Sequence, residues 1–417
     1  MTNRMFAREG EGWDDLRAEM EEAQAEDDRW DDRRNLRASY FAGEDVVRVA
    51  GEAFHMHMGD NAIYGPKSFA SLVRYEEGVV GMALEMLAAP EGAVGSVTTG
   101  GTESLVMAVK TARDWARENR PAKGRPEILV PRTAHPAFDK AAHFLDVGIR
   151  RISASVDFHA DVEALADAVT DETFMIVGSA PPYPLGVVDP IPEIAALAEA
   201  HGLWLHVDAC IGGFVLPFVK DLGHDVPDFD FTVPGVCSMS ADLHKYGYAN
   251  RGSSILMLRD RDLSHYQMFS SDDWNAGLYA TLNFAGSRAG GPVASAYAVM
   301  RYLGYGGYLE RVERILAAKQ RLWAGIEAIG GLRVWGRPQG GHFSFGSTSL
   351  DIFAVADGME AKGWLFGRAL DPAAMLLLLN PFHGEIVDGF LTDLEATVAA
   401  VKSGEIESSG SQAIYIV

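Results

Sequence analysis

Lys245 is the residue of this chain best suited to covalent chemistry. It lies in the run Ser238–Tyr248, which reads Ser-Met-Ser-Ala-Asp-Leu-His-Lys-Tyr-Gly-Tyr and precedes the apolar segment Ser254–Leu258. A lysine amine bonds to a carbonyl carbon once it has lost its proton, and partial desolvation or a nearby cation promotes that loss. His244 beside it can donate a hydrogen bond to a phosphate. The alternative interpretation is a solvated His-Lys pair on the surface.

A glycine-rich turn at Thr98–Ser104 reads Thr-Thr-Gly-Gly-Thr-Glu-Ser and stands between a predicted strand and a predicted helix. Gly100 and Gly101, followed by Thr102, let backbone N–H groups approach a ligand, and the N-terminus of a helix favours an anion. The spacing fits neither the dinucleotide-binding nor the P-loop pattern. The turn therefore indicates a phosphate site, with a plain strand–helix turn as the alternative.

A second glycine-rich turn, Gly286–Pro292, reads Gly-Ser-Arg-Ala-Gly-Gly-Pro and directly precedes a predicted helix. It carries a cation in Arg288 and a hydroxyl in Ser287, and both can bind an anion. Taken alone, the turn is more typical of an ordinary helix start than of an anion site.

Asp208 follows the apolar segment Leu203–Val207. A carboxylate at the C-terminal end of a buried parallel strand stands where α/β sheets bind ligands. Burial raises the pKa of a carboxyl group unless a cation lies opposite, so this residue predicts a cationic partner such as a protonated pyridine nitrogen. A helix cap or a turn is the alternative role.

The elements that position these residues alternate between strands and helices over residues 93–258, which predicts βαβ units and a mostly parallel sheet. We expect strands at Ala93–Val97, Glu127–Val130, Phe174–Val177, Leu203–Val207 and Ser254–Leu258, and helices at Thr102–Glu118, Ala137–Phe144 and Ile191–His201.

A second block is helical and is followed by a smaller α+β unit. We expect helices at Pro292–Leu303, Gly307–Ile329, Ile352–Lys362 and Ile386–Val401, and short apolar runs at Leu332–Trp335, His342–Phe345 and Met375–Leu379. The predicted domains are an N-terminal helical, dimer-contacting segment over 1–55, a large cofactor-binding domain over 56–310 and a small domain over 311–417. Within the first segment, Leu16 and Met20 have helical spacing.

The composition excludes several classes of protein. The 417 residues are 48% hydrophobic and 23% charged, which is typical of a globular chain, and a net charge of −22 disfavours nucleic acid and anionic membrane surfaces as partners. Two cysteines exclude a disulfide framework, make a metal site unexpected and fit a reducing cytoplasm. We find no signal peptide or apolar run long enough for a membrane anchor, so we expect a cytoplasmic protein.

In this order along one α/β chain, the four signals describe a pyridoxal phosphate site. The sequence resembles the fold-type I pyridoxal-phosphate enzymes, more closely the group II decarboxylases, and within them most closely the sphingosine-1-phosphate lyases. The resemblance covers roughly residues 55–400. It rests on Thr99–Ser104, Ala134–Ala142, His206–Phe214, Ser238–Tyr248, Arg251–Ser254 and Gly286–Gly291.

The resemblance implies the aspartate aminotransferase fold, with a seven-stranded, mostly parallel sheet in a large domain and a small C-terminal α+β domain. It implies that Lys245 holds the cofactor covalently, that Asp208 pairs with the pyridinium nitrogen and that His135 stacks on the ring. These three are the expected catalytic residues. The other expected cofactor-binding residues are Gly100, Gly101, Thr102, Ala209, Ser240, His244 and Ser287, the last from the second subunit of a homodimer with shared active sites.

The expected substrate contacts are Asn61, Tyr64, Tyr248 and Arg251. Tyr64 stands where the lyases carry a histidine, and Arg251 where they carry a phosphate-facing lysine. The resemblance therefore implies a carbon–carbon lyase that cleaves a phosphorylated 2-amino-3-hydroxy compound to an aldehyde and phosphoethanolamine. The alternatives are an amino-acid decarboxylase with the same cofactor and a non-catalytic protein that binds pyridoxal phosphate.

Overall fold

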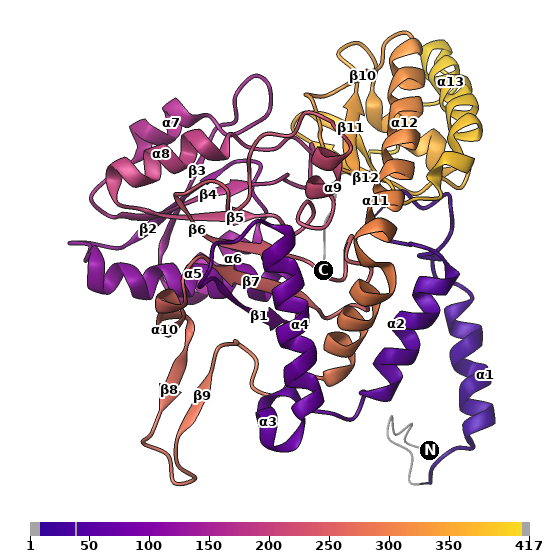
Figure 1. Cartoon of the computed structure of the whole chain (residues 1–417). Helices are drawn as coiled ribbons and strands as arrows, with labels where there is room; N and C mark the ends of the chain where they lie inside the picture. The colour runs from indigo at the N-terminus through magenta and orange to yellow at the C-terminus, as the bar shows by residue number, and fades with distance from the viewer. Residues whose placement is uncertain (1–8, 38–39, 411–417) are drawn as a thin grey trace, which may run out of the picture.

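Seven strands form one twisted sheet in the computed structural model, which describes residues 9–37 and 40–410 (Figure 1). The strand order is β1-β7-β6-β5-β4-β2-β3, and only β7 runs antiparallel to its neighbours. The predicted α/β class and the mostly parallel seven-stranded sheet are confirmed. The strands are β1 (Val94–Thr98), β2 (Glu127–Pro131), β3 (Gly148–Ile152), β4 (Thr173–Ser179), β5 (Trp204–Asp208), β6 (Val236–Ala241) and β7 (Ser254–Leu258).

The central strands are apolar on both sides because helices cover both faces of the sheet. All residues of β4 and β5 are buried. Successive residues of β2 enter different cores: Ile128 packs with α5 and α6, whereas Leu129 packs in the cluster that contains α8. In Figure 1, α7 and α8 accordingly lie on one side of the sheet and α5 on the other.

The helices of the large domain follow the predicted alternation with the strands. Helix boundaries agree with the predicted ones within a residue or two at α5, α6 and α8. The helices are α3 (Gly65–Ser68), α4 (Ala70–Met86), α5 (Gly101–Asn119), α6 (Ala137–Leu145), α7 (Val162–Ala168), α8 (Ile191–His201), α9 (Leu216–Asp221) and α10 (Ser264–Gln267), with short 3-10 turns at Ala62–Tyr64 and Arg261–Leu263.

A two-stranded hairpin of β8 (Phe269–Ser271) and β9 (Tyr279–Thr281) projects away from the body of the large domain (Figure 1). Its surroundings carry large apolar side chains that are exposed in the single chain, among them Trp274, Leu278 and Phe284. An exposed apolar patch of this kind is typical of an interaction surface.

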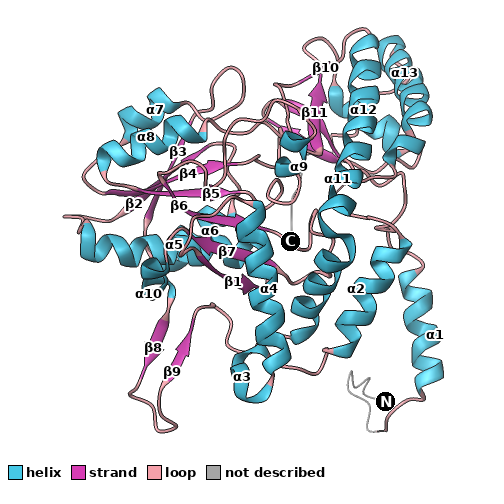
Figure 2. Ribbon diagram, viewed as in Figure 1, coloured by secondary structure: helices cyan, strands magenta, loops and turns pink. Residues whose placement is uncertain are grey.

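The C-terminal unit is the predicted small α+β domain (Figure 2). Its antiparallel sheet has the order β10-β11-β13-β12. The elements are β10 (Arg333–Val334), β11 (His342–Gly346), α12 (Ile352–Glu360), β12 (Gly367–Leu370), β13 (Ala373–Leu378), a 3-10 turn at His383–Glu385 and α13 (Val387–Ser403).

Helix α11 (Gly290–Ala328) connects the two domains and is broken at Gly304, where φ is 55°. The break separates the two helices predicted at Pro292–Leu303 and Gly307–Ile329. The predicted domain boundary at residue 310 falls inside the second of these.

Two further helices precede the large domain and lie beside it (Figure 1). They are α1 (Trp13–Gln24), the predicted N-terminal helix, and α2 (Glu44–Met56), which packs against α11. Residues of α1 are all exposed, including Trp13, Leu16 and Met20. Within the described residues, none of the helices combines the length and apolar character needed to cross a bilayer.

The predicted elements do not include strands β3 and β6 of the large sheet or helices α2 and α4. The sequence of β6, Val-Cys-Ser-Met-Ser-Ala, has an ordinary strand period, but the serines make it look like a polar loop. In the fold, Ser238 and Ser240 are fully buried and satisfied by hydrogen bonds from β5. Cys237 on the same strand is a free thiol whose pKa is raised by burial.

Gly212 tests how tightly the loop after β5 is packed. A Cβ at this position would lie 2.1 Å from the carbonyl oxygen of Ala180, which is backbone and cannot move aside cheaply. We expect Gly212→Ala to lower the free energy of unfolding by roughly 1–3 kcal/mol or more, because overpacking forces the backbone to shift. Thermal unfolding measures this, with Gly51→Ala as the control, because a Cβ on Gly51 meets nothing within 4 Å. Equal midpoints for the two variants would contradict the packing argument.

Candidate active site

Three chain segments that carry predicted site residues meet at one edge of the large sheet. Asp208 ends β5 and is paired in register with Ser240 of β6, the strand that leads to Lys245. Strand β1 runs in the same direction as β6, because β7 between them is antiparallel to both. The glycine turn after Thr98 therefore emerges at this same edge, where α/β sheets bind ligands.

Lys245 forms a buried ion pair with Asp242. Its Nζ lies 2.9 Å from Oδ2 of Asp242, whose side chain is 2% exposed. Burial alone would lower the pKa of Lys245, but the Asp242 carboxylate outweighs it and raises that pKa above its usual value. In turn the pKa of Asp242 is lowered, because Lys245 and His244 outweigh its burial. The pair therefore holds a protonated amine at the sheet edge.

Asp208 is held by hydrogen bonds from its own strand end and from β6. Oδ1 accepts from the backbone N–H of Cys210 at 3.1 Å and from the Ser240 hydroxyl at 3.4 Å. The thiol of Cys210 lies 3.3 Å from the same hydroxyl, and burial raises the pKa of this thiol far above its usual value. Donors directed at a carboxylate favour its ionised form.

A chain of hydrogen bonds extends from Asp208 to the far side of the strand. The indole of Trp204 and the imidazole of His206 both lie 2.8 Å from the Ser238 hydroxyl, and the other nitrogen of His206 lies 3.3 Å from Ser240. Because the Ser240 hydroxyl gives its one proton to Asp208, it accepts from Nε2 of His206, which leaves Nδ1 to accept from Ser238. Burial lowers the pKa of His206 to about 4, so the ring is neutral. Every donor in this series of hydrogen bonds then points toward Asp208.

The glycine turn forms a close cradle at the start of α5. A Cβ on Gly101 would lie 2.8 Å from the Asp242 carboxylate oxygens and 3.1 Å from Sγ of Cys210. Gly100 has a φ of +153°, and a Cβ there would lie 3.5 Å from the His244 ring. No side chain of a described residue caps this helix, so its first N–H groups, with exposed Thr102, are available to an anion.

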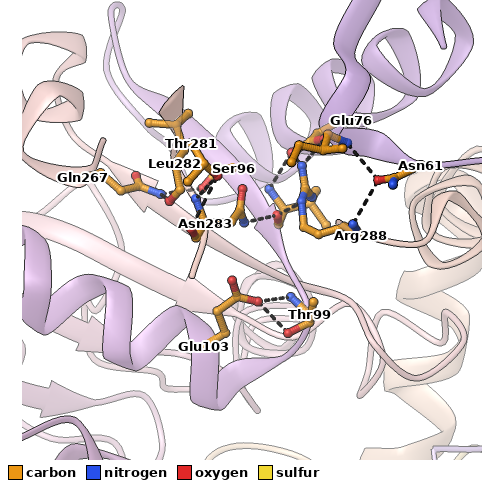
Figure 3. Close-up of polar contacts among 12 residues, drawn as sticks. Asn61, Glu76, Ser96, Thr99, Glu103, Gln267, Thr281, Leu282, Asn283 and Arg288 are labelled. Carbon is orange, nitrogen blue, oxygen red and sulfur yellow. Dashed lines mark hydrogen bonds and ion pairs between the residues drawn. The ribbon is translucent and has the colours of Figure 1, made fainter. Parts of the chain in front are cut away.

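Glu103 fastens this turn, as Figure 3 shows. One carboxylate oxygen accepts hydrogen bonds from the backbone N–H and the hydroxyl of Thr99, at 2.7 and 2.5 Å. The other oxygen accepts from the backbone N–H groups of Phe284 and Ala285, at 2.8 and 3.2 Å. Glu103 thus connects the glycine turn at Thr98–Ser104 to the segment before the second glycine turn.

The two histidines at the sheet edge, His135 and His244, are both partly buried. Nδ1 of His135 accepts from the backbone N–H of Ala137 at 3.1 Å, so a ring proton is on Nε2. Burial lowers the pKa of His135, while the nearby Asp208 raises it and Lys245 lowers it. The pKa of His244 is lowered mainly by burial as well. Both rings are therefore neutral at neutral pH.

The second glycine turn is held by its own subunit. Arg288 binds the carbonyl of Val97 at 2.7 Å and the Glu76 carboxylate at 3.2 Å, while Asn61 accepts from its backbone N–H (Figure 3). The Asn61 amide also donates to the Ser287 hydroxyl at 3.0 Å, and Ser287 is exposed. A cavity of about 160 Å³ separates this turn from Thr98 and Thr99.

Tyr40 is a site residue that the sequence analysis missed. It comes from the segment before α2, yet its buried hydroxyl lies within the electrostatic reach of Lys245 and Arg251. The Arg251 guanidinium lies over the Tyr40 ring, 5.5 Å from its centroid. Burial raises the pKa of Tyr40, so its hydroxyl stays protonated. The charge-dense N-terminal sequence gave no signal for this role.

Tyr183 approaches the same place from the segment after β4. It contributes to the pKa shift of Tyr40, and its hydroxyl would lie 3.1 Å from a Cβ on Gly367 of β12. The carbonyl of Pro182 accepts from the His342 ring at 3.2 Å, and the carbonyl of Pro184 accepts from the Ser344 hydroxyl. The small domain therefore fixes the position of Tyr183.

Three other residues stay predictions. Tyr248 stacks on Tyr308, with ring centroids 6.0 Å apart, and its backbone N–H donates to the carbonyl of Lys245. Ala209 is fully buried directly after Asp208. The side chain of Tyr64 lies outside the described part of the structure. The structure thus brings together Lys245, Asp208, His135, His244, Ser240, Arg251 and the glycine turn, and adds Tyr40, Tyr183, Asp242 and His206.

These residues fit pyridoxal phosphate. The Asp208 carboxylate accepts hydrogen bonds from Cys210 and Ser240, the His135 imidazole lies in electrostatic range of both Asp208 and Lys245, and an uncapped helix N-terminus with two close-packed glycines can receive the phosphate. Lys245 would bond to the cofactor, and Asp208 would pair with its pyridinium nitrogen.

The sequence matches the family model described as the pyridoxal-dependent decarboxylase conserved domain over residues 2–345. Sphingosine-1-phosphate lyase of Arabidopsis thaliana is 42% identical over 340 residues, or 80% of this chain and 62% of that protein. Sphingosine-1-phosphate lyase 1 of Mus musculus is 35% identical over 98% of this chain and 72% of its own length. The chain therefore spans less than two thirds of the Arabidopsis relative.

Solved structures give the same result. The sphingosine-1-phosphate lyase of Burkholderia pseudomallei has a TM-score of 0.92 and 34% identity, covering 96% of this chain and 94% of that one. Glutamate decarboxylase of Lactobacillus brevis has a TM-score of 0.83 at 19% identity, which shows the shared fold. On sequence and structure alike, the chain belongs to the pyridoxal-phosphate-dependent decarboxylase family, within its sphingosine-1-phosphate lyase branch.

Proposed function

We propose that this protein is a pyridoxal-phosphate-dependent carbon–carbon lyase that cleaves a phosphorylated 2-amino-3-hydroxy compound to an aldehyde and phosphoethanolamine. The observation that carries the proposal is a cation beside the buried phenol of Tyr40. Arg251 lies over the ring of Tyr40, and Lys245 and Arg251 both lower the pKa of that phenol against the effect of its burial. A guanidinium and a protonated phenol form a donor set that suits a phosphate.

The bound cofactor supplies an electron sink for the bond that breaks next to the substrate nitrogen. Residues of this chain around the cofactor maintain its capacity to accept electrons. Asp208, fixed by Cys210 and Ser240, stabilises a positive charge at the ring nitrogen. His135, neutral and partly buried, covers the ring without adding a competing charge.

The freed amine of Lys245 is suited to giving a proton. Asp242 raises its pKa, so it is protonated when it is not bonded to the cofactor. It can then deliver a proton to Cα of the product amine. The hydroxyls of Tyr40 and Tyr183 remain as hydrogen-bond donors for the substrate oxygens.

The proposal includes a cytoplasmic homodimer with shared active sites. The side chain of Ser287 is exposed and accepts a hydrogen bond from the Asn61 amide. This exposure leaves Ser287 accessible to a second subunit. The exposed apolar residues near the β8–β9 hairpin and on α1 support self-association. Two free cysteines fit a reducing compartment.

Replacing Lys245 tests the attachment of the cofactor. We expect Lys245→Ala to abolish the adduct that borohydride fixes on the protein, because no other amine pairs with Asp242 among the described residues. Absorbance and peptide mapping locate the adduct, with Lys220→Ala as the exposed-lysine control. A pyridoxyl group on any other lysine of the Lys245→Ala protein would refute the assignment.

Arg251 tests the class of substrate. A charge-assisted hydrogen bond is worth about 1.5–3 kcal/mol, so Arg251→Gln should lower kcat/KM roughly tenfold to 150-fold. We expect this loss with a phosphorylated substrate and little change with its dephosphorylated analogue. Arg251→Lys should fall between, because the charge remains and the planar fork is lost. Equal losses on both substrates would indicate that Arg251 binds a carboxylate, and would favour the decarboxylase.

Hybrid dimers test the shared site. Ser287→Asp places a negative charge where a partner's phosphate is expected, on an exposed side chain that folding does not need. Lys245→Ala and Ser287→Asp homodimers should both be inactive, and their mixed dimers should regain part of the activity through one intact site. If purified hybrids stay inactive, Ser287 serves the site of its own subunit.

A further inference from the structure

A cavity of about 900 Å³ lies between α9, the second half of α11 and the loop that leads into β11. Figure 1 shows these elements where the large domain meets the small one. None of the residues around Lys245 lines it. Its wall includes the apolar side chains of Val219, Leu222, Leu316 and Trp323.

Lys319 gives this cavity a buried charge. The residue is 5% exposed, and its Nζ donates to the carbonyls of Pro338 and Gly340 at 2.5 and 2.9 Å. Within residues 9–37 and 40–410, no carboxylate lies at ion-pair distance from this Nζ, and burial lowers the pKa of Lys319 to about 7. An ammonium has three donors, and among the described residues two carbonyls accept from it, while the centroid of the Trp323 ring lies 6.0 Å from Nζ.

The charged groups at the cavity limit what it can hold. Asp225 follows α9, Glu313 and Glu327 lie on α11, and all three are exposed. Arg337 is the exposed cation of the loop, while His224 lines the wall and His342 lies close enough for Lys319 to affect its pKa. Three exposed carboxylates repel a multivalent anion, whereas one buried ammonium suits a single negative charge.

We propose that this cavity binds an amphiphilic monocarboxylate, with its carboxylate on Lys319 and its apolar part against Leu316 and Trp323. A carboxylate accepts the third N–H of the ammonium without breaking either bond to the loop carbonyls. It also supplies the negative charge that a buried cation otherwise lacks. The apolar wall accounts for the rest of such a molecule.

The cavity wall is connected to the active site. Gln339, which lines the cavity, accepts from the backbone N–H of Val188 and donates its own backbone N–H to Gly186. Both partners follow Tyr183 in the segment that the small domain holds. A bound carboxylate therefore contacts the same loop that positions Tyr183, and we expect its binding to change KM more than kcat.

Calorimetric titration of the holoenzyme with sodium octanoate tests the proposal. We expect binding, with octan-1-ol at least about tenfold weaker because it lacks the charge. Lys319→Met should weaken octanoate binding at least about tenfold, while Lys220→Met on α9, which pairs with Asp228, should leave it unchanged. No octanoate binding, or equal binding of the alcohol, would overturn the proposal.

The pH dependence provides a separate readout. The carboxylate binds the protonated form of Lys319, so binding must take up a proton once the pH exceeds about 7. The Kd for octanoate should then rise by up to about tenfold per pH unit, and His224→Asn should keep this dependence. A flat profile between about pH 6 and 9 would exclude Lys319 as the anion-binding group.

A cavity-filling variant covers the case in which Lys319→Met fails to fold. Ala324 lines the cavity from an exposed position on α11, so Ala324→Trp can fill the space while Lys319 keeps both carbonyls. We expect this variant to lose octanoate binding and to keep its absorbance as holoenzyme. Unchanged octanoate binding would place the ligand elsewhere and refute the cavity as the site.

Discussion

The ion pair between Lys245 and Asp242 is the constraint on which the site depends. Asp242 is buried and Lys245 is partly buried, so the Asp242 carboxylate depends on the ammonium beside it to offset the loss of solvent. The need to keep the two charges together fixes the path of the chain after β6. It also requires glycine at position 101, because any Cβ there would displace the Asp242 carboxylate. The phosphate turn, the amine and the end of β6 are thereby held at one place.

Next to this pair, side chains of the sheet orient their hydrogen-bond donors toward Asp208. Trp204, Ser238, His206 and Ser240 form a series in which each donor points toward Asp208, and the series is possible because β5 and β6 are paired in register. The serines that make β6 polar are thus part of the site's electrostatics. A strand of ordinary aliphatic residues would pack as well and leave Asp208 with fewer donors.

The sequence was sufficient to predict those elements and site residues that a local pattern of residue types identifies. The alternation of strands and helices, Lys245, Asp208 and the glycine turn could all be predicted, because each depends on a short stretch of local sequence. Tyr40 could not, because its position depends on how a segment far from Lys245 in sequence packs against Arg251. The stacking of Tyr248, a predicted substrate contact, on Tyr308 is likewise a contact between distant segments that local pattern does not reveal.

The two free cysteines have a consequence for the chemistry of the product. Burial raises the pKa of Cys210 and of Cys237, so neither is a thiolate at neutral pH. The thiolate is the nucleophilic form, and an aldehyde is an electrophile that such a group attacks. A lyase that releases aldehydes next to a reactive cysteine would be damaged by its own turnover. With both thiols kept protonated, Cys210 and Cys237 are poor nucleophiles toward the aldehyde of the proposed reaction.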